Sequence, residues 1–224
     1  MRADIDQGYR IVPDVIDADE VMQLLRSLDG PDLPRSRAGA RHLMGHPSVR
    51  AVALDPRLLA LAAHVVGPSA VPYRATLFDK SPARNWLVPW HQDTALPLEE
   101  QRDVQGWGPW SHKGGITYAH APATALARVV ALRLHFDESG PDNGPLRVVP
   151  NTHTLGVLSD AQVSHVVERA TPSDCLVGIG GVIAMRPLIV HASSKAVSDR
   201  PRRVLHIEYI DSLDLGSGLR VAVA

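Results

Sequence analysis

The sequence predicts a mainly β protein in which helices flank a jelly-roll barrel. Its 224 residues suit a single domain and suffice for a substantial apolar core. Hydrophobic residues make up 45% of the chain and charged residues 21%, a balance that is ordinary for globular proteins and argues against disorder. Beyond residue 70, short apolar segments alternate with clusters of Pro, Gly, Asn and Asp, which is typical of antiparallel strands.

Residues 1–70 are expected to form helices that support the barrel. Asp17 and Glu20 have the spacing of a capping box, and apolar residues follow at helical spacing until a Gly-Pro pair stops the pattern. A second helix is predicted to begin after Asp55 and to end at Gly67.

Residues 71–224 are expected to form the jelly-roll core, which has about eight strands in such barrels. One short helix is predicted within it, because Ser159 and Gln162 form a second capping box. The predicted strands lie within residues 71–79, 127–137, 145–150, 181–187, 187–191 and 202–210.

The connection from about residue 97 to residue 122 is too long to be a neutral linker. It contains Trp107 and Trp110, two histidines and several glycines, without clear periodicity. We expect a lid over a functional site. The alternative is an ordered surface loop whose tryptophans pack on the barrel.

Composition restricts the partners. The net charge is −1, and no stripe of Lys and Arg with interleaved aromatic residues suggests nucleic-acid binding. No apolar run is long enough for a membrane span, and the N-terminal stretch lacks the apolar region of a signal peptide, so a cytoplasmic protein is expected. The lone Cys175 fits a reducing compartment and is interpreted as a buried structural thiol. The sequence does not indicate the oligomeric state.

His91 and Asp93 are two positions apart in the stretch NWLVPWHQDTALP. On a strand, residues i and i+2 point to the same side, so an imidazole and a carboxylate can reach one metal ion. Taken alone, this pair is explained more simply as a polar end to a buried strand. His191, at the end of a later apolar run, offers a third ligand. Two histidines and one carboxylate on a β scaffold form the facial triad of non-haem Fe(II) oxygenases.

The order of these residues resembles the phytanoyl-CoA dioxygenase family of Fe(II)- and 2-oxoglutarate-dependent oxygenases. The matching segments are WHQD, DNGPLRVVPNTH and IVHASS followed by RPRRVLHIEY. PNTH replaces the family's usual P-G-S-H, which changes a turn and leaves the ligands intact. The resemblance implies a cupin-like double-stranded β-helix, Fe(II) held by His91, Asp93 and His191, and 2-oxoglutarate and O2 as cosubstrates.

The resemblance also implies a cosubstrate site. Arg202, eleven positions after His191, matches the family arginine that binds the distal carboxylate of 2-oxoglutarate, and a guanidinium can bind a carboxylate with two hydrogen bonds. Ser193 matches a family serine at the same cosubstrate, and Asn85 is a further candidate. Strand parity leaves Arg203 open as the alternative, because Leu205, Ile207 and Tyr209 on its side of the strand could also face inward.

The predicted reaction is hydroxylation of a small molecule, with release of succinate and CO2. Desaturation, epimerisation and ring closure remain open. A different possibility is a metal-binding cupin-like barrel that lacks catalysis or works without 2-oxoglutarate. The residues proposed to contact substrate suggest an amino-acid derivative or a natural-product intermediate; they are Trp107, Trp110, Lys113, Tyr118 and Arg133.

Overall fold

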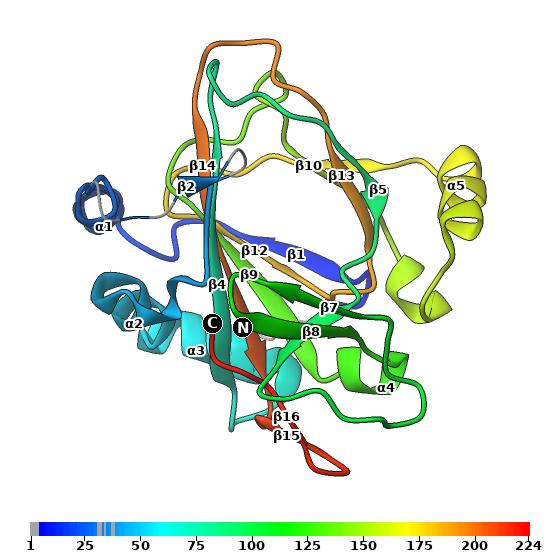
Figure 1. Ribbon diagram of the computed structural model, residues 1–224. Coiled ribbons are helices and arrows are strands. Elements are labelled where there is room, and N and C mark those ends of the chain that lie inside the picture. Colours follow the sequence, from blue (N-terminus) through cyan, green and yellow to red (C-terminus); the bar gives the residue numbers. More distant parts are fainter. Residues whose placement is uncertain (1–4, 31–32, 34, 37–38) are drawn as a thin grey trace.

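In the computed structural model, which describes residues 5–30, 33, 35, 36 and 39–224, two antiparallel sheets face each other (Figure 1). The larger sheet has the strand order β1-β12-β9-β14-β4-β3-β2, and the smaller sheet the order β11-β10-β13-β5. Helices flank both sheets. This arrangement confirms the predicted fold class, a mainly β double-stranded β-helix with flanking helices.

The larger sheet consists of β1 (Tyr9–Val12), β12 (Val182–Met185), β9 (Val129–His135), β14 (Arg202–Ile210), β4 (Val71–Lys80), β3 (Gly39–Arg41) and β2 (Arg35–Ser36). The smaller sheet consists of β11 (Ser173–Cys175), β10 (Leu146–Val149), β13 (Val190–Ser193) and β5 (Val88–His91). Outside these sheets lie β6 (Ala95–Leu98), β7 (Trp110–Lys113), β8 (Ile116–His120), β15 (Asp214–Gly216) and β16 (Leu219–Arg220).

Helices α1 (Ala18–Ser27), α2 (Pro47–Ala53) and α3 (Pro56–Val66) lie on the outer side of the larger sheet (Figure 1). Helix α5 (Asp160–Arg169) lies beside β5 of the smaller sheet. Both predicted capping boxes are present, at Asp17 for α1 and at Ser159 for α5, and Asp55 caps α3. The remaining helical segments are η1 (Leu43–Gly45), η2 (Thr152–Leu155) and α4 (Ala123–Leu126).

The outer face of the larger sheet is apolar because these helices cover it. Leu205, Ile207 and Tyr209 of β14 lie in one buried cluster with residues of α1, α2 and α3. The Tyr209 hydroxyl donates a hydrogen bond to the Ala53 carbonyl, 2.9 Å away. The alternate residues of β14 therefore face the interior of the barrel, and Arg202 is one of them.

Two expectations are corrected. Residues 1–70 are not only helical, because β1 pairs with β12 at one edge of the larger sheet and β3 pairs with β4 near the other. The segment 97–122 is not a lid loop without regular structure, since β7 and β8 form a hairpin that pairs with β6. Both errors have one cause: short strands have little periodicity of their own and depend on distant partners for their hydrogen bonds.

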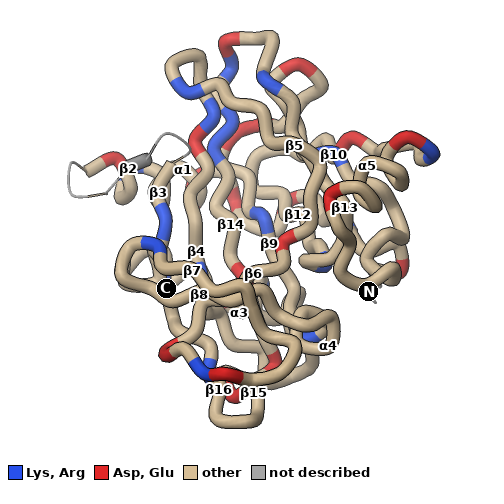
Figure 2. The backbone as a smooth tube through the Cα atoms, turned by 45° about the vertical axis from the view of Figure 1, so that its right-hand side comes forward, with Lys and Arg blue, Asp and Glu red and all other residues tan. Residues whose placement is uncertain are grey.

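Charged residues of both signs are interspersed along the backbone (Figure 2). In this view, neither positive nor negative charge is confined to one part of the described backbone. Within the described part of the chain, no helix has both the length and the apolar character that a bilayer crossing requires.

Candidate metal centre

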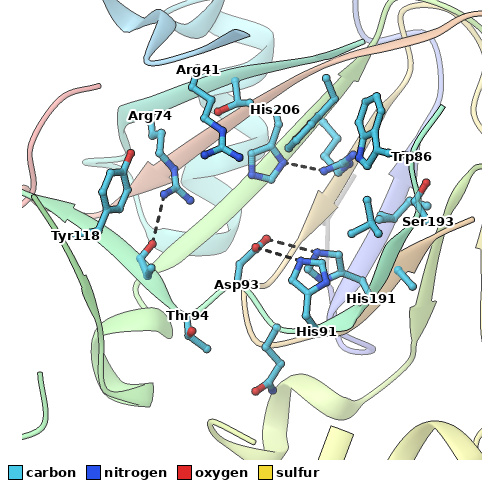
Figure 3. A pocket seen from close by; sticks show the side chains of 18 of the residues that line it. Arg41, Arg74, Trp86, His91, Asp93, Thr94, Tyr118, His191, Ser193 and His206 are labelled. Atoms are coloured by element: carbon cyan, nitrogen blue, oxygen red, sulfur yellow. Dashed lines mark hydrogen bonds and ion pairs between the residues drawn. The ribbon is translucent and has the colours of Figure 1, made fainter. Parts of the chain in front are cut away.

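The barrel brings His91, Asp93 and His191 together (Figure 3). His91 and His191 are directly opposite each other on the antiparallel strands β5 and β13, with ring centroids 4.2 Å apart. The Asp93 carboxylate lies 3.6 Å from His91 Nε2 and 3.5 Å from His191 Nε2. The three ligand atoms all lie within 4.8 Å of one another, which is close enough to surround one metal ion.

Backbone carbonyls orient both imidazoles. His91 Nδ1 is 2.8 Å from the Pro89 carbonyl oxygen, and His191 Nδ1 is 2.9 Å from that of Ile189. A carbonyl can only accept a hydrogen bond, so we assign the proton of each ring to Nδ1. This leaves each Nε2 with a free lone pair directed at the site, which is the usual arrangement of histidines that bind metal.

Gln92 lies between His91 and Asp93 and fixes the chain just after the end of β5. Its Nε2 donates to the carbonyls of Gly156 and Leu188 at 2.9 and 2.7 Å, and its Oε1 accepts from the Leu158 amide at 2.8 Å. The sequence suggested that Asp93 lies on the same strand as His91. In the structure β5 ends at His91, so Asp93 lies just beyond the strand. These hydrogen bonds, together with the one that the Asp93 amide donates to the Pro187 carbonyl at 2.9 Å, hold the chain beyond the end of β5.

The charges at the site suit a cation. Burial alone would raise the pKa of Asp93, but His191 and His91 hold it well below its usual range, so Asp93 is ionised. Burial lowers the pKa of His191 to about 4. A carboxylate and a neutral imidazole are the protonation states in which these residues bind metal.

A cavity of about 410 Å³ opens beside the triad, between the two sheets. Half of its lining residues are inward-facing residues of β4, β9 and β14 or belong to β5 and β13. Its volume is in the range of small-molecule sites.

Arg202 lines one end of this cavity, and Lys80 lies next to it without being part of the lining. They are directly opposite each other on β4 and β14, and the structure buries both. Ser193 Oγ accepts from Lys80 Nζ at 2.8 Å and from Arg202 Nη2 at 3.1 Å, and donates to the Gly144 carbonyl at 2.8 Å. Ser193 thus holds two cations in place without neutralising them.

The guanidinium of Arg202 is incompletely paired. Its Nη1 is buried and has no hydrogen-bond partner within the described residues. Burial and the nearby Arg133 lower the pKa of Arg202 to about 9, and burial with Arg202 lowers that of Lys80 to about 7. Buried like charges of this kind are unfavourable unless an anion joins them, so the donor set fits a carboxylate of 2-oxoglutarate.

Arg203 points the other way. Its guanidinium forms two hydrogen bonds with Asp137, at 2.7 and 2.8 Å, outside the cavity. Arg202 therefore faces the cavity and Arg203 faces away from it, so the structure favours Arg202 as the arginine that binds cosubstrate.

The other predicted site residues divide into two groups. Lys113, Tyr118 and Arg133 line the cavity. Trp107 and Trp110 do not; they pack in an apolar cluster with residues of β6, β8 and β16, which is the alternative considered for these tryptophans.

Asn85 also lies outside the cavity lining. Its amide exchanges two hydrogen bonds of 2.8 Å with the backbone of Ala196, so it joins the β4–β5 connection to the β13–β14 connection. Both polar atoms of the amide are thereby bound to backbone, which gives Asn85 a structural role. An asparagine in a turn and one in a binding site look alike in sequence.

Several cavity residues were missed by the sequence analysis. His206 and Glu208 alternate with outward-facing residues of β14 as Arg202 does, and Arg74 is the cross-strand neighbour of Glu208 on β4. Once β14 and β4 are paired, this alternation predicts that all three side chains face inward. Arg41 lies on a strand of three residues, and nothing in the sequence placed it at the site. The charged and imidazole side chains of the cavity lining that were not predicted are Arg41, His42, Arg74, His120 and His206, and Glu208 is bound to Arg74.

A facial triad inside a double-stranded β-helix is the arrangement of non-haem Fe(II) oxygenases. The chain belongs to the Phytanoyl-CoA dioxygenase (PhyH) family, which it matches over residues 6–204.

One curated relative is the L-proline trans-4-hydroxylase of Streptomyces griseoviridis, with 26% identity over 180 residues, or 69% of this chain. The match spans 59% of that protein's length. AviO1 from Streptomyces viridochromogenes Tue57 has a similar structure, with a TM-score of 0.66 and 24% identity over 94% of this chain and 91% of that one. EctD from S. alaskensis with 2-oxoglutarate and 5-hydroxyectoine has a TM-score of 0.69 and 20% identity, over 92% and 72% of the two chains. These two likenesses show a shared fold.

Proposed function

We propose that this protein is an Fe(II)- and 2-oxoglutarate-dependent dioxygenase that hydroxylates a small molecule. The observation that carries the proposal is the pairing of two features in one cavity: a triad of two imidazoles and a carboxylate, and a buried arginine with an unpaired nitrogen. Membership of the phytanoyl-CoA dioxygenase family supports it.

In this proposal His91, Asp93 and His191 hold Fe(II). The ligand set is the facial triad that leaves coordination positions open for cosubstrate and oxygen. The backbone carbonyls of Pro89 and Ile189 keep the two Nε2 atoms unprotonated and directed at the metal. Gln92 keeps Asp93 in register with the histidines through its three backbone hydrogen bonds.

Arg202 binds the distal carboxylate of 2-oxoglutarate, while Ser193 holds Lys80 beside Arg202, so that Lys80 adds positive charge to this end of the cavity. In the free protein the two positive side chains repel each other. The dicarboxylate offsets this repulsion when it binds, which makes binding more favourable. When bound, Fe(II) with 2-oxoglutarate and O2 supplies the oxidant for cleavage of a substrate C–H bond, with release of succinate and CO2.

The substrate is a small molecule such as an amino-acid derivative or a natural-product intermediate. The volume of about 410 Å³, which cosubstrate and substrate must share, supports a compact substrate. The curated relative named for hydroxylation of L-proline supports the same size class.

The test is turnover. The purified protein with Fe(II) and ascorbate should convert 2-oxoglutarate to succinate, faster with a true substrate from a panel of small molecules. Calorimetry without oxygen should detect binding of 2-oxoglutarate that requires the divalent metal and Arg202. A protein that binds metal but neither binds nor consumes 2-oxoglutarate would instead be a cupin-like barrel of the alternative kind.

A further inference from the structure

A row of residues crosses the larger sheet at the level of the cavity. Arg133, His206, Thr76 and Arg41 are consecutive cross-strand neighbours on β9, β14, β4 and β3. Directly opposed residues share one face of a sheet, so all four side chains face the interior. Arg133 Nη1 donates to His206 Nδ1 at 3.0 Å, and Arg41 lies at the far end of the row.

Arg74 lies next to this row, two residues along β4 from Thr76. Its Nε and Nη2 are bound to Glu208, with 2.7 Å from Nη2 to Oε1, and its Nη1 is 3.3 Å from the Ala95 carbonyl. Glu208 is its direct cross-strand neighbour, so register alone explains the ion pair. Arg74 is consequently held in a fixed position at the cavity wall.

Arg41 has no such partner. Figure 3 shows the guanidinium groups of Arg41 and Arg74 pointing into the cavity on the side away from His91 and His191. Among the described residues, none forms an ion pair or a hydrogen bond with the Arg41 side chain. Arg41 and Arg74 both lower the pKa of His42, after burial, which places the two positive charges near the same ring.

Tyr118 and Lys113 complete this end of the cavity, on the hairpin of β7 and β8. The Tyr118 hydroxyl lies 2.8 Å from His42 Nε2. Arg74 and Lys113 each lie 5.7 Å from the centre of the Tyr118 ring. The end of the cavity opposite Arg202 therefore has an aromatic ring surrounded by cations.

Formal charges show that this excess persists in the loaded site. The charged residues that line the cavity are Arg41, Arg74, Lys113, Arg133 and Arg202, with Asp93 the acidic one. A divalent metal and the dianion of 2-oxoglutarate cancel each other, and Glu208 offsets only Arg74. Arg41 therefore presents to the cavity a positive charge that the cosubstrate at Arg202 does not neutralise.

We infer that Arg41, with Arg74 beside it, binds a carboxylate of the substrate, so that the substrate is a small organic acid anchored at the end of the cavity away from Arg202. The inference rests on the proposed function and adds the substrate class. A guanidinium binds a carboxylate with two parallel hydrogen bonds, and Glu208 positions the second guanidinium so that it adds charge without moving. A carboxylate matches the planar fork of one guanidinium.

The test compares small acids with their primary amides: L-proline with L-prolinamide, L-phenylalanine with its amide, and benzoate with benzamide. Binding is measured by calorimetry without oxygen, on protein saturated with Fe(II) and 2-oxoglutarate. At least one acid should bind about tenfold or more tightly than its amide, because the amide lacks the charge. Arg41→Gln should weaken binding of the acid about ten- to a hundredfold, and Arg41→Lys should restore part of the lost affinity.

Arg50→Gln is the matched control, because Arg50 is an exposed arginine of α2 outside the cavity. It should leave acid binding unchanged. The affinity for 2-oxoglutarate should remain unchanged in all Arg41 variants, since that carboxylate is assigned to Arg202. Arg41 is itself exposed, so its replacement should not affect folding.

Three results would overturn the inference: no acid in the panel binds, the amides bind as tightly as the acids, or Arg41→Gln binds acids like the wild type. Each leaves the proposed function standing if 2-oxoglutarate still binds. If 2-oxoglutarate itself does not bind, the proposed function fails. The acids and amides are then compared on protein without it, with Arg202→Gln beside Arg41→Gln to show which arginine is used.

Discussion

Lys80 and Arg202 lie directly opposite each other on β4 and β14, and one hydroxyl oxygen, Ser193 Oγ, accepts a hydrogen bond from each. Like charges at directly opposed positions destabilise a sheet. Here both are buried, and Arg202 keeps one nitrogen unpaired. The pair therefore costs stability in the free protein, and in the proposed function the distal carboxylate of 2-oxoglutarate offsets part of that cost.

Arg202→Ala should raise the KM for 2-oxoglutarate by about ten- to a hundredfold and leave Fe(II) binding nearly intact. Hydrogen bonds to charged groups contribute about 1.5–3 kcal/mol, and about 1.4 kcal/mol corresponds to a factor of ten. Steady-state kinetics with varied 2-oxoglutarate gives the KM, and calorimetry gives the metal affinity. Arg202→Lys should recover only part of the loss, because lysine lacks the planar fork.

Arg203→Ala is the control for this prediction. Its guanidinium pairs with Asp137 outside the cavity, so the variant should lose some stability and keep the wild-type KM. A defect in 2-oxoglutarate use in Arg203→Ala, with normal use in Arg202→Ala, would contradict the assignment.

The affinity for 2-oxoglutarate should fall as the pH rises above about 7. Burial, together with Arg202 and Arg133, lowers the pKa of Lys80 to about 7 in the free protein. A bound dicarboxylate favours the protonated amine and raises this pKa, so the complex holds more protons than the free protein above pH 7. Binding must then take up a proton, and a higher pH opposes it.

Calorimetry in buffers of different ionisation enthalpy measures this uptake directly. At about pH 8 we expect uptake approaching one proton per bound 2-oxoglutarate. Lys80→Met should bind more weakly and with much less uptake. Equal proton uptake by the wild type and Lys80→Met would assign the titration to another group.

His91→Ala and His191→Ala should each abolish both Fe(II) binding and turnover, because each leaves only one imidazole and one carboxylate. Metal content after dialysis and succinate formation are the two measurements. Thermal unfolding should change little for His91→Ala, since that side chain is part of a half-exposed cavity wall. His165→Ala, which removes an exposed histidine of α5, should retain metal; metal retained equally in all three variants would exclude the triad.

Gln92→Ala should weaken metal binding although Gln92 is not a ligand. The change leaves the Leu158 amide and the carbonyls of Gly156 and Leu188 without their partner. Replacement of groups that orient metal ligands typically costs about 10–100-fold in metal affinity. A buried donor left unpaired costs about 1–3 kcal/mol, so the free energy of unfolding should fall as well.

Metal titration and denaturant unfolding of the same variant separate these effects. Gln92→Glu keeps the acceptor for Leu158 but turns a carboxylate oxygen toward the carbonyls of Gly156 and Leu188, so it should destabilise the protein at least as much as Gln92→Ala. Unchanged metal affinity in a destabilised Gln92→Ala would limit the residue to a structural role.

The sequence by itself determined the elements whose signals are local. The capping boxes at Asp17 and Ser159 predicted α1 and α5 because the side chain and the amides it caps are within one turn. The long apolar segments predicted β4, β9 and β14, and the spacing of His91, Asp93 and His191 predicted the candidate triad, which the fold brings together.

Tertiary structure decided what depends on partners distant in sequence. The inward direction of Arg202 follows from the helices that cover the other face of β14. Arg41 enters the cavity only because β3 pairs with β4 and places it opposite Thr76. Asn85, which looked like a cosubstrate ligand, is bound to the backbone of Ala196. A strand's residues alternate between two faces with equal ease, and only packing against the rest of the protein determines which face becomes the site.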